Sequence, residues 1–234
     1  MSFTSVPELK TGYLTPIHEV HQVLKTAVER NVLMFCSAPD EGNFTEFAHY
    51  PSGPWCDRFL RIGAATASGT AFDWTPEDGI TYILPGVDVI MEQAAKVTHD
   101  TNPLRRIPIL ESKETGSGIA AALAAGLAAM VIYCVKASIL ATKIDNQSTG
   151  SGMGLLPDKA AGDIARPDEM KRAFARLGKP TSNNFIPVWD ELDRVSHLLE
   201  GWRASGSNPA ERRKCTQAFV EFGVSLYHAA KWEH

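Results

Sequence analysis

The stretch that decides the fold is ETGSGIAAALAAGLAAMVIYC, residues 114–134. A glycine-containing turn at 115–118 leads into a long run of small and apolar residues, which predicts a long helix that begins directly after the turn. A strand-to-helix turn of this kind often presents a nucleophilic serine at the start of the helix. Ser117 and Gly118 are the two residues that lie where such a serine would be.

The overall composition is that of an ordinary globular protein. The chain has 234 residues, of which 44% are hydrophobic and 21% are charged, so it is long enough to bury a substantial core. Its formal net charge of −4 gives no basic footprint for nucleic acid or for an anionic membrane surface. We therefore expect no nucleic-acid partner.

The apolar run from Ile119 to Val135 contains no charged residue and is close to the lower length limit of a membrane-spanning helix. It is dominated by Ala and Gly and stops at Lys136, so we expect a helix buried in an α/β core and no membrane partner. The first ten residues, MSFTSVPELK, lack the basic and apolar regions of a signal peptide. Together with four cysteines that form no CxxC pair, this predicts a reducing, cytoplasmic location.

Strands and helices alternate in the first part of the chain, and helices follow. The pattern predicts an α/β sheet layer and then a helical tail, with a Gly/Ser-rich link after residue 145. The polar region 92–113 is expected to be an inserted loop. The predicted helices are 15–31, 166–178, 187–203 and 209–232, and the predicted strands are 31–38, 59–66 and 81–89.

Five motifs in order resemble the C-terminal half of the subtilisin-like serine protease family, in particular its intracellular fungal type. The resemblance implies a subtilisin-like three-layer α/β fold with a mainly parallel sheet over residues 1–145, and a linker with a helical extension over 146–234. Family members carry their catalytic Asp and His before the first of these motifs, so we expect this chain to lack both. The motifs are VLMFCSAPDEGN (32–43), YPSG (50–53), RIGAA (61–65), YILPGVDV (82–89) and TGSGIAAALAAG (115–126).

The resemblance also assigns positions to the site. Gly118 matches the catalytic serine, Ser117 matches the Ser or Thr before it, and Asp40 matches the oxyanion-hole Asn. Gly118 has no side chain with which to attack. Ser117 could serve only after a one-residue slip, which turns a helical side chain by about 100°; otherwise its hydroxyl caps the helix. Asp40 is either a protonated oxyanion donor or a turn residue after Pro39.

Three functions follow as hypotheses. The first is a subtilisin-like peptidase homologue that is catalytically inactive and binds a peptide or protein partner along its strands. The second is a serine endopeptidase whose N-terminal catalytic half is missing from this sequence or is supplied by another chain. The third is an interaction module of a larger protein. The predicted strand at Met1–Thr4 would leave a sheet edge open to self-association.

No cofactor or metal is expected. The sequence has no GxGxxG after a strand and no GxxxxGK[ST]. His18 and His21 lie three residues apart on a predicted helix, but no Cys or carboxylate accompanies them at ligand spacing. We interpret them as exposed helix residues.

Overall fold

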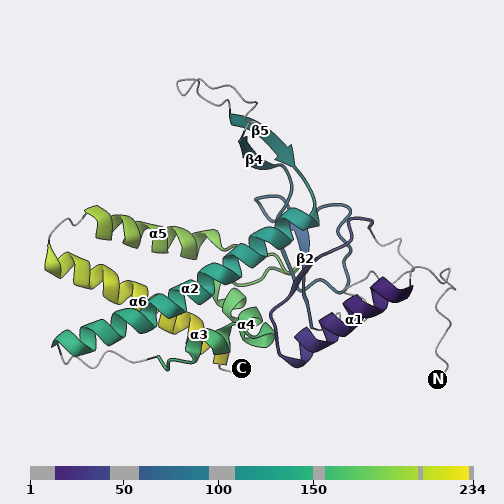
Figure 1. The fold of residues 1–234 in the computed structure, drawn as a ribbon. Helices are drawn as coiled ribbons and strands as arrows, with labels where there is room; N and C mark the ends of the chain where they lie inside the picture. The colour runs from purple at the N-terminus through teal and green to yellow at the C-terminus, as the bar shows by residue number, and fades with distance from the viewer. Residues whose placement is uncertain (1–13, 43–57, 95–108, 150–155, 205–207, 232–234) are drawn as a thin grey trace, which may run out of the picture. The chain divides into compact units, whose positions relative to one another are not determined.

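The structure is a computed structural model that describes residues 14–42, 58–94, 109–149, 156–204 and 208–231 (Figure 1). The chain divides into two compact units, Met1–Val32 and Leu33–His234. The first unit contributes α1 (Leu14–Glu29), close to the predicted helix. Asn31, with a φ of 52°, ends it in the left-handed region. The predicted strand at Met1–Thr4 and the YPSG motif lie outside the described residues.

The centre of the second unit is a three-stranded parallel sheet with the strand order β1-β2-β3. Each strand lies inside one of the three apolar stretches predicted from the sequence, so the mixed α/β class is confirmed. Cys36 lies opposite Arg61, and Gly63 lies opposite Ile83. The strands are β1 (Phe35–Ser37), β2 (Leu60–Ala65) and β3 (Tyr82–Pro85).

An antiparallel hairpin follows the sheet. Its strands are β4 (Val89–Ala94) and β5 (Ile109–Glu114), paired from Val89–Glu114 to Ala94–Ile109. The prediction of an irregular loop over 92–113 was therefore wrong at both ends of that region. Ile90, Lys113 and Glu114 of the hairpin are exposed. Backbone hydrogen bonds hold the two strands together outside the core, so the sequence needs no alternation of apolar and polar residues there.

The long helix α2 (Ser117–Thr149) begins directly after the turn, as predicted, and continues past residue 145. It packs against all three strands of the sheet and against α6 (Figure 1). The helical tail is confirmed, and α4 and α6 also pack against each other. The tail helices are α3 (Ala160–Ile164), α4 (Pro167–Leu177), α5 (Trp189–Ala204) and α6 (Pro209–Lys231).

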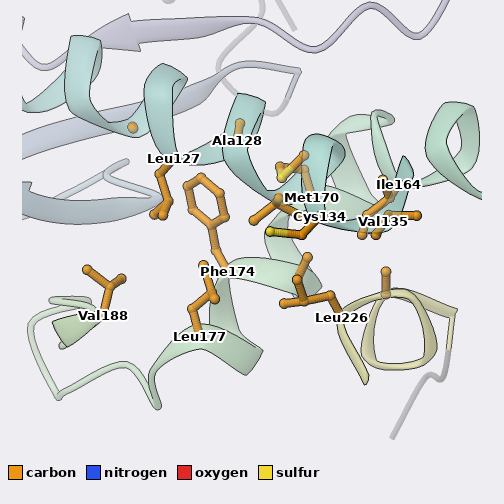
Figure 2. Packing of buried hydrophobic residues seen from close by; sticks show 14 of the residues in the cluster. Leu127, Ala128, Cys134, Val135, Ile164, Met170, Phe174, Leu177, Val188 and Leu226 are labelled. Atoms are coloured by element: carbon orange, nitrogen blue, oxygen red, sulfur yellow. The ribbon is translucent and has the colours of Figure 1, made fainter. Parts of the chain in front are cut away.

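The tail helices and the sheet share one hydrophobic core. Phe174 of α4 is completely buried, and its ring lies 6.4 Å from the ring of Phe35 and 6.0 Å from that of Tyr82, measured between centroids. The Tyr82 hydroxyl donates a hydrogen bond of 2.9 Å to the carbonyl oxygen of Lys171. Figure 2 shows side chains of α2, α4 and α6 meeting around Phe174 and Leu226. The tail is thus part of the core that supports the sheet.

The opposite face of the sheet is covered by loop residues. A Cβ added to Gly63 would lie 2.5 Å from Cγ2 of Thr75 and 2.9 Å from Cγ2 of Ile83. Phe185 packs there against Ala65 and Ile83 in a second, smaller cluster. Only a glycine at position 63 lets the loop approach β2 so closely.

By length and composition, one helix in the described part of the chain could cross a membrane: α2 over Ser117–Ile144, 28 residues with a mean hydropathy of 2.2. Core helices of soluble proteins meet the same criterion. One third of its most apolar window is buried inside the structure. The packing on the sheet and on α6 therefore accounts for only part of its apolar surface.

Candidate functional site

Two glycines shape the turn before α2. Gly116 has a φ of 149°, which side chains rarely adopt, and its N–H donates to the carbonyl oxygen of Gly86 at 2.8 Å. A Cβ added to Gly86 would lie 2.9 Å from Cβ of Ala64 and 2.9 Å from the carbonyl oxygen of Gly116. The end of β3 and the start of α2 therefore touch through backbone, and this contact fixes where Ser117 lies.

Ser117, the first residue of α2, is fully buried, with 0% of its surface exposed. Its hydroxyl donates to Oδ1 of Asp40 at 2.5 Å and accepts a hydrogen bond of 3.0 Å from the backbone N–H of Ala64 in β2. Its own N–H donates to Oδ2 of Asp40 at 2.8 Å. One serine thus ties together α2, β2 and the turn after β1.

Asp40 follows β1 in this turn and is partly buried. Both of its carboxylate oxygens accept hydrogen bonds from Ser117. One of them satisfies a backbone N–H that the first turn of a helix leaves without an intrahelical partner. A carboxylate at a helix N-terminus is also stabilised by the positive end of the helix dipole. In this geometry Asp40 acts as an acceptor that holds the start of α2.

Gly118 lies next to Ser117 but in a different environment. It is exposed, and a Cβ built on it would meet no atom within 4 Å. The position that resembles the family's nucleophile therefore has room for a side chain and carries none.

The carboxyl ends of the parallel strands converge on this turn. Asp40 follows β1, Thr66 follows β2 and Gly86 follows β3. Ligands of open α/β sheets bind at this edge, where loops from neighbouring strands meet the start of a helix. Sequence reasoning found Asp40 and Ser117 here but missed the N–H of Ala64, because no residue type reveals a backbone donor.

The sequence did not reveal a cluster of charged and polar side chains around the buried carboxylate of Asp163, where α3, α4 and α6 meet. Asp163, 7% exposed, lies 3.4 Å from Nζ of Lys231, and the Tyr227 hydroxyl donates to it at 3.3 Å. Burial raises the pKa of Asp163, but the charges of Lys231 and Lys159 and the two hydrogen bonds outweigh burial and lower it. Burial and the Asp163 charge raise the pKa of Tyr227. Asp163 and Tyr227 are 64 positions apart, so no local sequence pattern indicates that they are in contact.

The cysteines and histidines of the described ranges offer no metal-binding group, and the buried thiol of Cys134 is unreactive. Burial raises the pKa of Cys134 to about 11, so its thiol is neutral at pH 7 and a poor nucleophile. His18 and His21 lie on α1. Within the part of the chain that the structure describes, no group of three or more His, Cys, Asp or Glu side chains is placed to hold a metal ion.

No protein-family model matches the chain, and no curated protein matches it. The subtilisin-like resemblance therefore rests on the order of the five motifs. The hydrogen bonds between Ser117 and Asp40 and the exposure of Gly118 are the features of this turn that bear on function.

Proposed function

We propose that this chain is a non-catalytic homologue of subtilisin-like serine proteases that binds a peptide or protein partner. It would keep a C-terminal part of that fold, with the small parallel sheet, the helix after the turn and the helical tail. One observation carries the proposal. The Ser117 hydroxyl is buried between Asp40 and Ala64, while Gly118, at the position of the family's nucleophile, is exposed without a side chain.

The burial of Ser117 argues against a role as nucleophile. An attacking oxygen must come within about 3–3.5 Å of the carbonyl carbon of the substrate. The Ser117 side chain has no exposed surface, and its hydroxyl is engaged as donor and as acceptor. Exposing it would break its hydrogen bonds to Asp40 and Ala64 and would release the start of α2 from β2 and from the turn after β1.

Asp40, at the position that matches the oxyanion-hole Asn, also argues against catalysis. Both oxygens of Asp40 are already engaged as acceptors by Ser117, so we expect neither to donate to a developing oxyanion. In subtilisin itself, loss of the corresponding amide donor lowers turnover by roughly 10²–10³-fold. A carboxylate at that place would add repulsion to the loss of the donor.

Binding is the function that this turn still supports. The exposed backbone at Gly118 lies at the carboxyl edge of the sheet, where loops after β1, β2 and β3 meet the start of α2. An extended peptide could hydrogen-bond to backbone groups at this edge without any catalytic side chain. We therefore place the binding surface around Gly118.

The test combines turnover and binding on the purified chain. A broad fluorogenic peptide library should show no hydrolysis above that of Ser117→Ala. An immobilised peptide library should retain the wild type, and Gly118→Leu should lose that retention, because the new side chain would occupy the proposed surface. Gly162→Leu is the matched control, since Gly162 is also exposed with no atom within 4 Å of an added Cβ, but lies in α3.

Two results would contradict the proposal. Hydrolysis by the wild type that disappears in Ser117→Ala would make the chain an enzyme. Equal retention of Gly118→Leu and Gly162→Leu, or no retention of any peptide by the wild type, would remove the binding surface from this turn.

A further inference from the structure

The outer face of α2 carries an apolar stripe that the described part of the chain covers only in part, since Ile119, Met130 and Ala137 are partly buried and Met130 packs against the core. We call it the outer stripe. Large members of the stripe are strongly exposed: Leu123 to 46%, Leu140 to 61%, and Tyr133 and Ile144 each to 67%. The sheet and α6 pack on the other side of the helix. The outer stripe consists of Ile119, Leu123, Gly126, Met130, Tyr133, Ala137, Leu140 and Ile144.

The spacing of the outer stripe fits a helical partner. The eight residues are separated alternately by four and three positions, without interruption. This is the 3.5-residue repeat of a coiled-coil seam, into which a second helix packs.

The order of residues within the outer stripe makes it complementary to itself in reverse. Reading from the two ends inward, Ile119 matches Ile144 and Leu123 matches Leu140. The next step brings two small residues together, and the central step pairs two large ones. In an isologous contact between antiparallel helices residue i of one copy meets residue j of the other and j meets i, so this order brings residues of similar size together. The inner pairs are Gly126 with Ala137 and Met130 with Tyr133.

The charges beside the outer stripe favour the same antiparallel arrangement. From 119 to 144 the only charged residues are Lys136 and Lys143, both in the C-terminal half of the stripe. In an antiparallel pair matched in this way they lie at the level of Leu127 and Ala120 of the other copy, whereas a parallel pair would bring the lysines of both copies to the same level. Lys143 is already neutralised by Asp158 of its own chain, at 2.6 Å.

We propose that two copies of this chain associate through their outer stripes, with the two α2 helices antiparallel about a two-fold axis. The small residues Gly126 and Ala137 let the helices approach closely, and the pairs of Leu and Ile at both ends bury the exposed apolar surface. This inference does not depend on the proposed function, since it uses the face of α2 and not the turn at Gly118.

The first experiment measures the oligomeric state of the full chain by sedimentation velocity over a range of concentrations. We expect the wild type to form a dimer, and Leu140→Glu to raise the dissociation constant at least ten-fold. Leu140→Gln, without the charge, should weaken the dimer in the same direction if the glutamate variant folds poorly. Ala125→Glu is the matched control, because Ala125 is exposed on α2 but lies off the outer stripe, and it should stay dimeric.

Disulfide trapping tests the direction of the pair. A mixture of Leu123→Cys and Leu140→Cys chains should form a mixed disulfide dimer on mild oxidation, while Leu140→Cys alone should form no more dimer than the wild type. Preferential self-crosslinking of Leu140→Cys would show a parallel pair and overturn the antiparallel arrangement.

The same variants show whether the outer stripe contacts something other than a second copy. A wild-type chain that stays monomeric at all concentrations overturns the proposal, as does a dimer that Leu140→Glu leaves intact. Co-sedimentation of the wild type with phosphatidylcholine vesicles, lost in Leu140→Glu but kept in Ala125→Glu, would assign the stripe to a bilayer instead of a second copy.

Discussion

The two faces of α2 have the same apolar character but opposite surroundings. Ala124, Val131 and Val135 on one face are buried against the sheet and the tail, while Tyr133 and Leu140 on the other are exposed. A helix that is apolar all round does not indicate which side faces its core. The polar contacts of Ser117 and the close packing of Ser138 against Gly223, and not hydrophobicity alone, orient this helix.

Both of these features lie on the inward side of α2. Ser117 is held at the first residue by Asp40 and Ala64. Further along, the Ser138 hydroxyl bonds to the carbonyl oxygen of Cys134, and a Cβ on Gly223 of α6 would lie only 2.1 Å from Oγ of Ser138. Rotation of α2 by one residue would break the bonds of Ser117 to Asp40 and Ala64, at about 1–3 kcal/mol for each buried group left unpaired. It would also move Ser138 away from Gly223.

The largest effect should come from placing a charge on each face. Val135→Asp buries a carboxylate without a partner, so we expect a loss of at least about 3–5 kcal/mol and a chain that is largely unfolded. Leu140→Asp places the same charge in solvent and should leave the monomer folded. Urea unfolding followed by circular dichroism measures both. Equal destabilisation by the two variants would mean that the faces are wrongly assigned.

Two Gly→Ala substitutions test the packing on the two faces of α2. At Gly223 the new Cβ collides with Ser138 and lies 3.0 Å from the carbonyl oxygen of Cys134, so we expect a loss of about 1–3 kcal/mol. At Gly126 it meets no atom within 4 Å, so the higher helix propensity of alanine should stabilise the monomer by roughly 0.5–1 kcal/mol. The free energy of unfolding from urea titration, at concentrations where the chain is monomeric, should change in opposite directions.

Ser138→Ala provides a control for the collision at Gly223. It removes the closest atom, so the double variant should recover part of the stability that Gly223→Ala loses. A Gly223→Ala variant as stable as the wild type would show that α2 and α6 do not pack as closely as described.

A pair of acidic residues extends the comparison from apolar groups to charges. Asp163 is buried beside Lys231, whereas Asp158 is exposed beside Lys143. Asp163→Asn at pH 7 should lower the melting temperature by about 2–4 °C, the shift expected for roughly 1 kcal/mol in a chain of this size. Asp158→Asn should change it by less, because exposed ion pairs contribute little.

The stability that Asp163 contributes should depend on pH. The pKa of Asp163 is lowered from 3.8 in the folded chain, so its contribution to stability is complete above about pH 4 and is lost as the pH falls through the folded pKa. Melting curves of the wild type and Asp163→Asn should therefore converge below pH 4. A gap that stays constant down to pH 2 would contradict the role of the Asp163 charge.

The smallest effect concerns the reactivity of a thiol on each face. Because burial raises the pKa of Cys134 to about 11, only about one part in a thousand is thiolate at pH 8. Iodoacetamide should leave Cys134 unmodified in the folded chain, and should modify the exposed thiol of Ala125→Cys. Peptide mass mapping identifies the modified positions. Rapid modification of Cys134 in the wild type would show that this face of α2 is accessible.

The sequence predicted those parts of the fold that local patterns determine. The apolar runs around Leu60–Ala65 and Tyr82–Pro85 form strands because their neighbours in the core are apolar along the whole run. Helix α4 ends at Leu177, next to Gly178, as predicted from the glycine. A Cβ at Gly178 would lie 2.6 Å from the carbonyl oxygen of Pro187, so the close contact explains the glycine.

The remaining features depend on contacts between distant residues. The hairpin of β4 and β5 could not be predicted, because its sequence lacks the alternation of apolar and polar residues that indicates a strand. The sequence indicated that the apolar run of α2 is buried, but only its inner face is, because a continuous apolar run carries no information about which side is covered. At the site, Ser117 and Asp40 were found from the motifs, yet their mutual hydrogen bonds join residues 77 positions apart.

The most direct test of the non-catalytic proposal is the intact mass of the folded chain after incubation with a fluorophosphonate, with an active serine hydrolase in the same tube as the positive control. Because Ser117 is buried and Gly118 has no side chain, the mass of the chain should not change while the control enzyme is fully labelled. A single adduct on the folded wild type that is absent in Ser117→Ala would contradict the proposal and would make Ser117 a reactive nucleophile.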